Sequence, residues 1–140
     1  MNINFLLKTR KLKKIPKDIE KSKSSIKIAK SRIIESQNLL KEKFYKQSIL
    51  SSYTSMFHSA RALLYKDGIQ EKSHYATLVY LKEKYSKTIP LNILNNFENY
   101  MRTRHNILYG LEDSNESNQK ATNSIKTAKA FLSIINNILE

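Results

Sequence analysis

Residues 53–64 read YTSMFHSARALL, and this stretch decides the fold. Across residues 46–66 the apolar side chains recur every three or four positions, which places them on one face of a helix. These side chains are Ile49, Tyr53, Met56, Phe57, Ala60, Leu63 and Leu64. Gly68 follows, and glycine is favoured in the left-handed conformation just past a helix end. The pattern predicts a helix over about 46–66 with one buried face and with Arg61 at the edge of that face.

The same spacing predicts further helices on both sides of this segment. Their expected limits are Pro16 to about Lys43, Ser73 to Tyr85, Pro90 to about Tyr109, and Asp113 to Leu139. Pro16 and Pro90 suit a first helical turn, Gly110 suits a left-handed helix end, and Asp113 and Glu116 have capping-box spacing. No stretch alternates with a two-residue period, so we expect no sheet. Because the connections are short, consecutive helices should be antiparallel neighbours. The predicted fold class is all-α, an up-and-down four-helix bundle with an additional shorter helix.

Length and charge define the expected domain organisation. The chain has 140 residues and a formal net charge of +13, which suits a single domain with an uneven charge distribution. Residues 1–46 contain 14 Lys or Arg and 4 Asp or Glu, whereas the rest contains 11 and 8. We expect residues 1–15 to form a basic leader, either a short helix packed on the body or a frayed tail, and residues 16–140 to form one helical domain. Such a basic region attracts nucleic acid, an acidic partner or an anionic membrane surface, or is simply a solvated lysine face.

Composition excludes several kinds of site. The chain has no Cys, and its three His residues lack metal-ligand spacing, so we expect no metal site. It has no glycine-rich loop that would bind phosphates, so we expect no nucleotide cofactor. No apolar run is long enough for a signal peptide or a membrane span, so we expect a cytoplasmic location and no membrane attachment.

Residues 104–109, RHNILY, provide the strongest candidate site. Arg104 lies on the apolar face of its helix, together with Leu94, Phe97, Met101, Leu108 and Leu111. A guanidinium there is costly unless it is paired, reaches water, or faces an interface or a cleft. An Arg beside an imidazole and a phenol can bind a phosphodiester and move protons, which makes Arg104, His105 and Tyr109 the candidate catalytic residues.

Additional candidates for binding RNA or nucleotide lie around this motif. Arg102, His105 and Tyr109 share one strip of the helix because they are spaced three and seven positions apart. Arg61 and His74 are the other candidates, although His74 in a first helical turn also has a simpler role as a local hydrogen-bonding group. Taken alone, the spacing favours residues at an interface between copies of the chain in a helical oligomer.

These segments together resemble a HEPN domain (higher eukaryotes and prokaryotes nucleotide-binding) of the small stand-alone prokaryotic kind. The resemblance covers about residues 20–138 and rests on YTSMFHSARALL at 53–64, then DGI at 67–69, KSH at 72–74, and RH followed by YG at 104–110. It implies a helical bundle that forms a two-fold dimer. Catalytic HEPN members cut RNA without metal, using an Arg, a polar residue directly after it, and a His a few residues further on.

The match of this motif to the chain is incomplete. Arg104 matches the Arg and His105 matches the polar residue, but Tyr109 stands where the catalytic His is expected. The family also implies a toxin–antitoxin pair with a minimal nucleotidyltransferase, which in some pairs attaches AMP to a HEPN tyrosine, so that Tyr109 is a candidate acceptor.

The resemblance leaves two functions open. The first is a toxin-type, metal-independent RNA endonuclease that acts as a dimer. The alternative is a non-catalytic module that docks a nucleotidyltransferase partner, or binds nucleotide or RNA without cleavage. A purely structural oligomer with Arg104 in an intersubunit ion pair is a third reading, and membrane attachment through residues 1–15 is the weakest.

Overall fold

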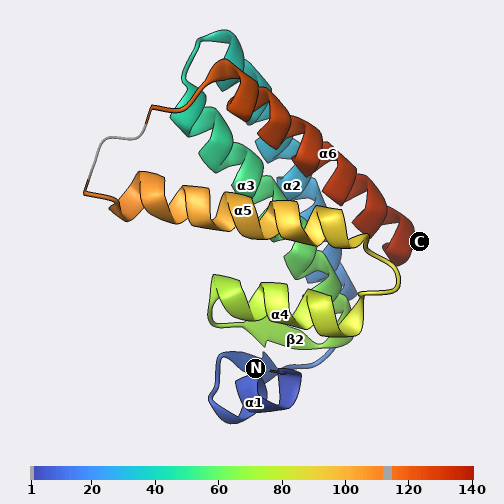
Figure 1. Cartoon of the computed structure of the whole chain (residues 1–140). Coiled ribbons are helices and arrows are strands. Elements are labelled where there is room, and N and C mark those ends of the chain that lie inside the picture. Colours follow the sequence, from blue (N-terminus) through green and yellow to red (C-terminus); the bar gives the residue numbers. More distant parts are fainter. Residues whose placement is uncertain (1, 112–114) are drawn as a thin grey trace.

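Four long helices form the body of the protein. The computed structural model describes residues 2–111 and 115–140. The long helices are α2 (Ile19–Lys41), α3 (Tyr45–Asp67), α5 (Leu91–Tyr109) and α6 (Asn118–Leu139). Figure 1 shows α2, α3 and α6 running alongside one another, with α5 crossing them and the short helix α4 (His74–Lys84) beneath α5. The predicted all-α fold class is confirmed.

Small polar side chains let α2 and α3 pack closely. Ser22 donates a hydrogen bond to the Ala62 carbonyl (2.8 Å), and Ser55 donates one to the Ala29 carbonyl (2.8 Å). Both serines are buried. Because each hydroxyl has a backbone acceptor on the opposite helix, these small side chains are buried between the helices without an unsatisfied polar group.

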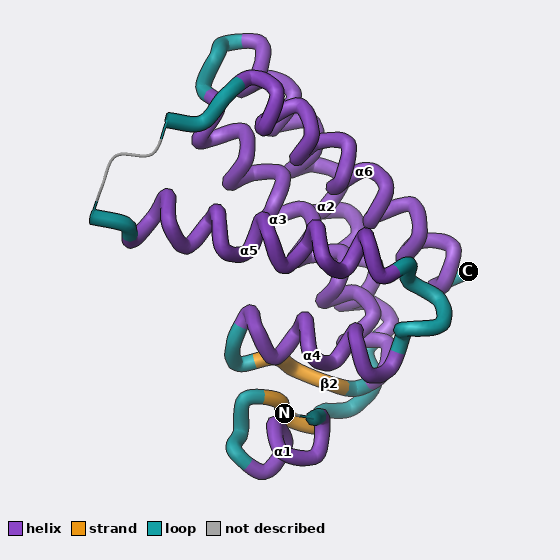
Figure 2. Tube along the Cα trace, viewed as in Figure 1, coloured by secondary structure: helices purple, strands orange, loops and turns teal. Residues whose placement is uncertain are grey.

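The N-terminal segment is part of the folded body. It contains helix α1 (Ile3–Lys8) and strand β1 (Leu12–Lys14), which pairs in antiparallel fashion with β2 (Ile69–Glu71). Figure 2 shows this two-stranded ribbon beneath α4. Leu6 and Leu12 are almost fully buried in the main core. The expectation of no sheet was wrong, because strands of three residues are too short to show a two-residue period in the sequence.

Several predicted helix ends agree with the structure. Gly68 follows α3 with φ of 76°, in the left-handed region, as predicted. Ser73 precedes α4 and its hydroxyl accepts a hydrogen bond from the Ala76 N–H (3.0 Å), as predicted for an N-cap.

Four predicted helix ends differ from the structure. α2 begins at Ile19 rather than in the turn of Pro16, because the Asp18 side chain caps it by accepting from the Lys21 N–H. Gly110 has φ of −66° and ψ of 145°, so the chain leaves α5 in an extended conformation. α6 begins after Ser117, which caps it; Asp113, the expected cap, lies outside the described residues. Pro90 precedes α5 rather than occupying its first turn.

The second half of α5 extends beyond the body (Figure 1). Leu94 and Phe97 are buried as predicted, but Leu108 is 46 % exposed and Leu111 104 %. The predicted apolar face therefore faces the core over its first half only. In the described part of the chain, no helix is both long and apolar enough to cross a bilayer.

Candidate functional site

Arg104 lies where α5 leaves the core. Its guanidinium carbon is 5.9 Å from the centre of the Tyr53 ring, a cation–π distance. Tyr53 comes from the buried face of α3 and is 1 % exposed, and its ring also stacks with that of Phe97 on α5 (centroids 5.7 Å apart). The apolar faces that pack α3 against α5 therefore also place the Tyr53 ring beneath Arg104.

His74 joins the same group from the first turn of α4. Its Nδ1 is 2.7 Å from the Tyr53 hydroxyl, and its ring stacks on that of Phe57 with centroids 4.1 Å apart. Because Ser73 caps α4, the position and direction of this first turn are fixed. One imidazole nitrogen is thus bonded to the core, and among the described residues the other has no hydrogen-bond partner.

The surroundings keep both members of this pair uncharged. Burial, and then the positive charges of Arg104 and Arg61, lower the pKa of His74 from its usual 6.5 to about 4. Burial raises the pKa of the Tyr53 hydroxyl, although the charge of Arg104 opposes that change. At neutral pH the pair is therefore a neutral phenol bonded to a neutral imidazole, beside the positively charged guanidinium of Arg104.

Arg104 and His74 line one open cavity of about 410 Å³. The other lining residues are Tyr75, Met101, Arg102, His105 and Asn106. Among the described residues no carboxylate lines it, and its two guanidinium groups, two imidazole rings and one amide fit an anion with hydrogen-bond acceptors, such as a phosphodiester.

His105 and Tyr109 lie further along α5. Their ring centroids are 5.1 Å apart, and His105 lines the cavity whereas Tyr109 does not. Tyr109 is 64 % exposed at the outer end of the helix. Arg102 is held at the rim by hydrogen bonds to Glu98 (3.4 Å) and Asn99 (2.7 Å).

Arg61 is placed elsewhere. Its Nε is 3.2 Å from a Glu71 carboxylate oxygen, and it donates a hydrogen bond to the Tyr65 hydroxyl (2.8 Å). It does not line the cavity, and its charge acts on His74 only through space. Arg61 thus links α3 to the ribbon.

The described residues contain no group of His, Cys, Asp or Glu that could hold a metal ion.

The family model of the HEPN domain matches residues 22–138. The chain belongs to the HEPN domain family. HEPN domains are all-α, commonly dimerise, and include ribonucleases and toxins. No curated protein matches the chain.

Within this HEPN domain, sequence reasoning missed Tyr53 and Phe57 as parts of the site. Both lie on the regular apolar face of α3, where spacing predicts only core residues. Their contacts with His74 join α3 to α4, and no local pattern in the sequence indicates which residues of different helices meet. The structure brings together Arg104, His105, Arg102 and His74, and separates Arg61 and Tyr109 from their cavity.

Proposed function

We propose that this HEPN domain is a toxin-type, metal-independent RNA endonuclease that acts as a homodimer. The observation that supports the proposal most directly is that Arg104 and the neutral His74 open into one cavity without a carboxylate. An unpaired guanidinium in such a place attracts a phosphate, and its planar donors match two phosphate oxygens at once.

The chemistry follows from this placement. Arg104 holds the scissile phosphodiester and balances the negative charge that grows on it in the transition state. His105 accepts the proton of the attacking 2′-hydroxyl, with Tyr109 beside it, or Tyr109 positions that hydroxyl. The oxygen attacks phosphorus, the bond to the 5′-oxygen breaks, and that oxygen takes a proton from water while His105 returns its proton to the solvent. The products are a 2′,3′-cyclic phosphate and a 5′-hydroxyl. His74 replaces the imidazole that the motif lacks at Tyr109, as a hydrogen-bonding group on the phosphate.

The outer end of α5 provides the surface for a second copy. Three large apolar side chains close together in the sequence are exposed there: Leu108, Tyr109 and Leu111. Exposed apolar side chains grouped in this way mark interaction sites. A two-fold contact along this end would bring two Arg104 side chains toward one cleft. A Leu108→Asp variant should sediment as a monomer; a variant that remains dimeric would place the dimer contact elsewhere.

The decisive test is cleavage by Arg104 variants. Arg104→Ala should abolish RNA cleavage in the presence of a chelator, and should relieve growth inhibition, while its helical circular dichroism is retained. The matched control is Arg32→Ala, which removes an exposed arginine paired with Glu35 on α2. Intact RNA with the wild-type dimer, or equal cleavage by Arg104→Ala, refutes the nuclease.

The second candidate is a non-catalytic module that binds a minimal nucleotidyltransferase. The exposed hydroxyl of Tyr109, at the position of the missing His, favours it, since an exposed phenol is open to transfer of AMP. Under this alternative a Tyr109→Phe variant prevents modification by the partner, and Arg104→Ala weakens binding while no variant changes any cleavage rate.

A further inference from the structure

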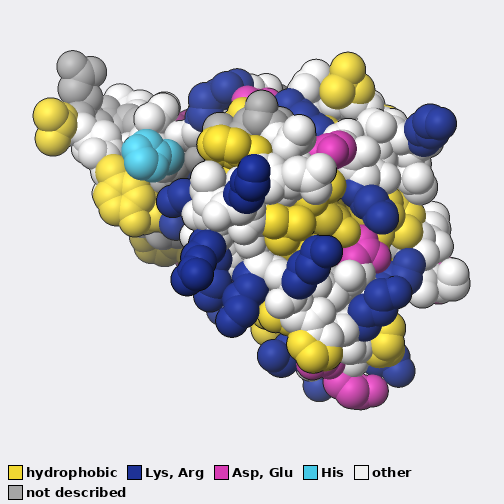
Figure 3. All heavy atoms as spheres, turned by 90° about the horizontal axis from the view of Figure 1, so that it is seen from below, with side chains coloured by type: hydrophobic (Ala, Val, Ile, Leu, Met, Phe, Trp, Pro, Cys, Tyr) yellow, Lys and Arg dark blue, Asp and Glu magenta, His cyan; other side chains and the backbone are white. Residues whose placement is uncertain are grey.

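A second cavity lies at the N-terminal end of the molecule. Its volume is about 710 Å³, and it is lined by Leu7, Arg10, Leu12, Lys13, Lys14 and Lys72. Leu12 is buried, whereas the four cations are exposed. Figure 3 looks at the molecule from this end, where dark-blue Lys and Arg side chains crowd the surface. An apolar base with a cationic rim fits the phosphates and the sugars or bases of a nucleotide chain.

The cations in this cavity have no acidic partner among the described residues. The nearby carboxylates already have other partners: Glu71 pairs with Arg61, Glu83 accepts from the Ile3 N–H, Asp67 accepts from the Tyr80 and Tyr85 hydroxyls, and Asp18 caps α2. Residues 2–17 contain no Asp or Glu. No ion pair within the described fold therefore engages these cations, which leaves them available to an external polyanion.

Backbone hydrogen bonds fix the main chain that carries these cations. The Lys72 N–H donates to the Lys11 carbonyl (2.8 Å), which continues the ribbon, and the Lys11 N–H donates to the Leu6 carbonyl (2.9 Å). Arg10, which precedes Lys11 in this turn, has φ of 61°, a left-handed conformation uncommon for residues other than glycine. A solvated lysine tail needs none of these constraints, whereas a preformed binding surface benefits from them.

Residues that line this basic cavity and residues that line the cavity of Arg104 lie close together at 72–75. Lys72 lines the first, and His74 and Tyr75 line the second. Since Lys72 and His74 are two residues apart, their Cα atoms lie within about 7 Å. Tyr75, which lines the cavity of Arg104, is 50 % exposed, and an exposed aromatic ring offers a face on which a base can stack.

We propose that the basic cavity is a second binding site for single-stranded RNA. It holds the phosphate backbone of nucleotides adjoining the one bound at Arg104, with Tyr75 stacking on a base between them. The proposal rests on the proposed function, because it concerns the same RNA. A flexible strand can follow two adjoining concave surfaces, whereas a flat anionic membrane would touch only their rims.

The test compares RNA length and salt dependence of binding. The probes are a 2′-O-methyl oligouridylate of about 12 nucleotides, a length within the usual range of single-strand sites, and the matching dinucleotide. Methylation removes the attacking hydroxyl, so binding is measured without cleavage. In a variant with Lys13, Lys14 and Lys72 all changed to Ala, the slope of log affinity against log salt for the long probe should become shallower by about 2, given about 0.7 per phosphate contact on single strands. Binding of the dinucleotide, which reaches only Arg104, should be unchanged.

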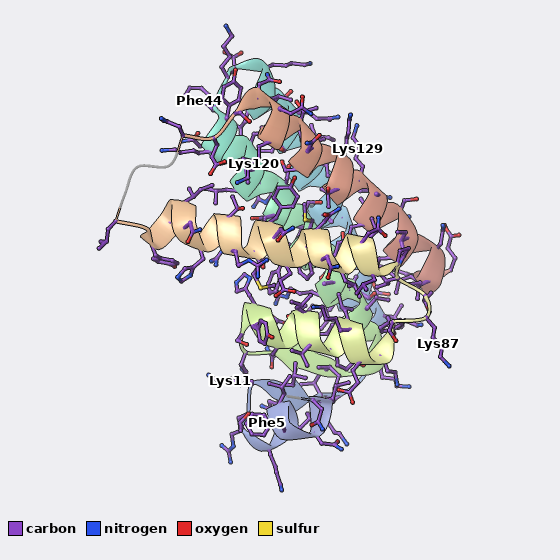
Figure 4. All side chains as sticks on the ribbon, in the orientation of Figure 1. Phe5, Lys11, Phe44, Lys87, Lys120 and Lys129 are labelled. Atoms are coloured by element: carbon purple, nitrogen blue, oxygen red, sulfur yellow. The ribbon has the colours of Figure 1, made fainter. Side chains whose placement is uncertain are left out.

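The matched control removes the same charge from other surfaces. It changes Lys87, Lys126 and Lys129 to Ala, which are all exposed and have no acidic partner in the described fold. Figure 4 labels Lys87 and Lys129, which lie far from Lys11 at the ribbon. If control and test variants lose equal salt dependence, only net charge matters and the second site is refuted.

Two further outcomes separate this site from the Arg104 site and from a membrane. In the first outcome, Arg104→Ala binds the dinucleotide with wild-type affinity, while the lysine changes still lower the salt slope of the long probe. The proposed function then fails and the basic site stands. If the lysine variant loses binding to phosphatidylglycerol vesicles but keeps the wild-type salt slope for the long probe, the surface binds membrane and the RNA proposal is overturned. Because the three lysines are exposed, the variant should retain its helical content; should it not, each single substitution is expected to lower the slope by about 0.7.

Discussion

Acidification should destabilise this protein partly through His74. The pKa of the imidazole is about 4 in the folded state, because burial and the charges of Arg104 and Arg61 disfavour the imidazolium, against 6.5 as the ordinary value. The unfolded state therefore binds more protons than the folded state between these two values. The stabilising contribution is complete above pH 6.5 and is lost as the pH falls towards 4.

The size of the loss follows from the difference in pKa. For a fully buried group with a pKa of about 4 in the folded state and 6.5 in the unfolded state, acidification from pH 7 to pH 4.5 would lower the free energy of unfolding by about 2 kcal/mol. His74 is only half-buried, and water screens part of the interaction, so we expect about 1 kcal/mol. The pKa of His58 is also lowered, mainly by burial, so the wild type should lose more than this amount in total.

A comparison of variants isolates the contribution of His74. In His74→Asn the amide oxygen remains near the position of Nδ1 and accepts the Tyr53 hydroxyl, while the titrating group is removed. Urea denaturation at pH 7 and pH 4.5 should show a loss of stability that is smaller in this variant than in the wild type by about 1 kcal/mol. His105→Asn, which removes an exposed imidazole, is the control.

Two results would refute this reasoning. One is a pH dependence of His74→Asn equal to that of the wild type, and the other is an equal change in both variants. Either would mean that the imidazole stacked on Phe57 is as free to take up a proton in the folded protein as in the unfolded chain.

Three further predictions concern the stability of the fold, each measured by urea denaturation with the free energy of unfolding as the readout. Gly68→Ala should lower it by about 2 kcal/mol, because φ is 76° and a Cβ would come within 2.7 Å of a backbone carbonyl oxygen; a neutral effect would contradict the left-handed turn. Asp67→Asn should lower it by about 2 kcal/mol, because one carboxylate oxygen accepts the hydroxyls of Tyr80 (2.7 Å) and Tyr85 (2.6 Å), and an unchanged value would mean that these bonds add nothing. Ser36→Leu should lower it by about 1 to 3 kcal/mol, since Ser36 is fully buried between α2 and α3; a stabilised variant would disprove the close packing of these helices.

The helices were predictable because their apolar faces are long and regular. The buried side chains Tyr53, Met56 and Leu63 lie on the face that three- and four-residue spacing predicts. Ser22 interrupts the corresponding pattern of α2, yet it is buried, because its hydroxyl bonds to a carbonyl of α3. Spacing of apolar residues alone does not reveal a buried hydroxyl whose acceptor lies on another helix.

The ribbon and the site were less predictable for a related reason. β1 and β2 are far apart in the sequence, and their pairing, which sets Leu12 opposite Glu71, depends on tertiary contacts. The motif at Arg104 is local and was predicted, but one of the two imidazoles that line its cavity comes from α4. His74 reaches the cavity only because α3 provides Tyr53 and Phe57 as its supports.

The position of Arg104 explains why one helix both builds the core and borders the site. Before it, Phe97 is fully buried; after it, Leu108 is exposed, so Arg104 lies at the boundary. A guanidinium at that boundary avoids full desolvation, yet the ring of Tyr53 beneath it leaves one of its faces without water. The charge of Arg104 has no carboxylate partner among the described residues of the cavity, and an RNA phosphate would provide an anionic partner. The apolar side chains at the outer end of α5 are exposed, and a second copy of the chain would cover them. Since two Arg104 side chains facing one cleft would repel each other without an anion, RNA binding and dimer formation should each strengthen the other.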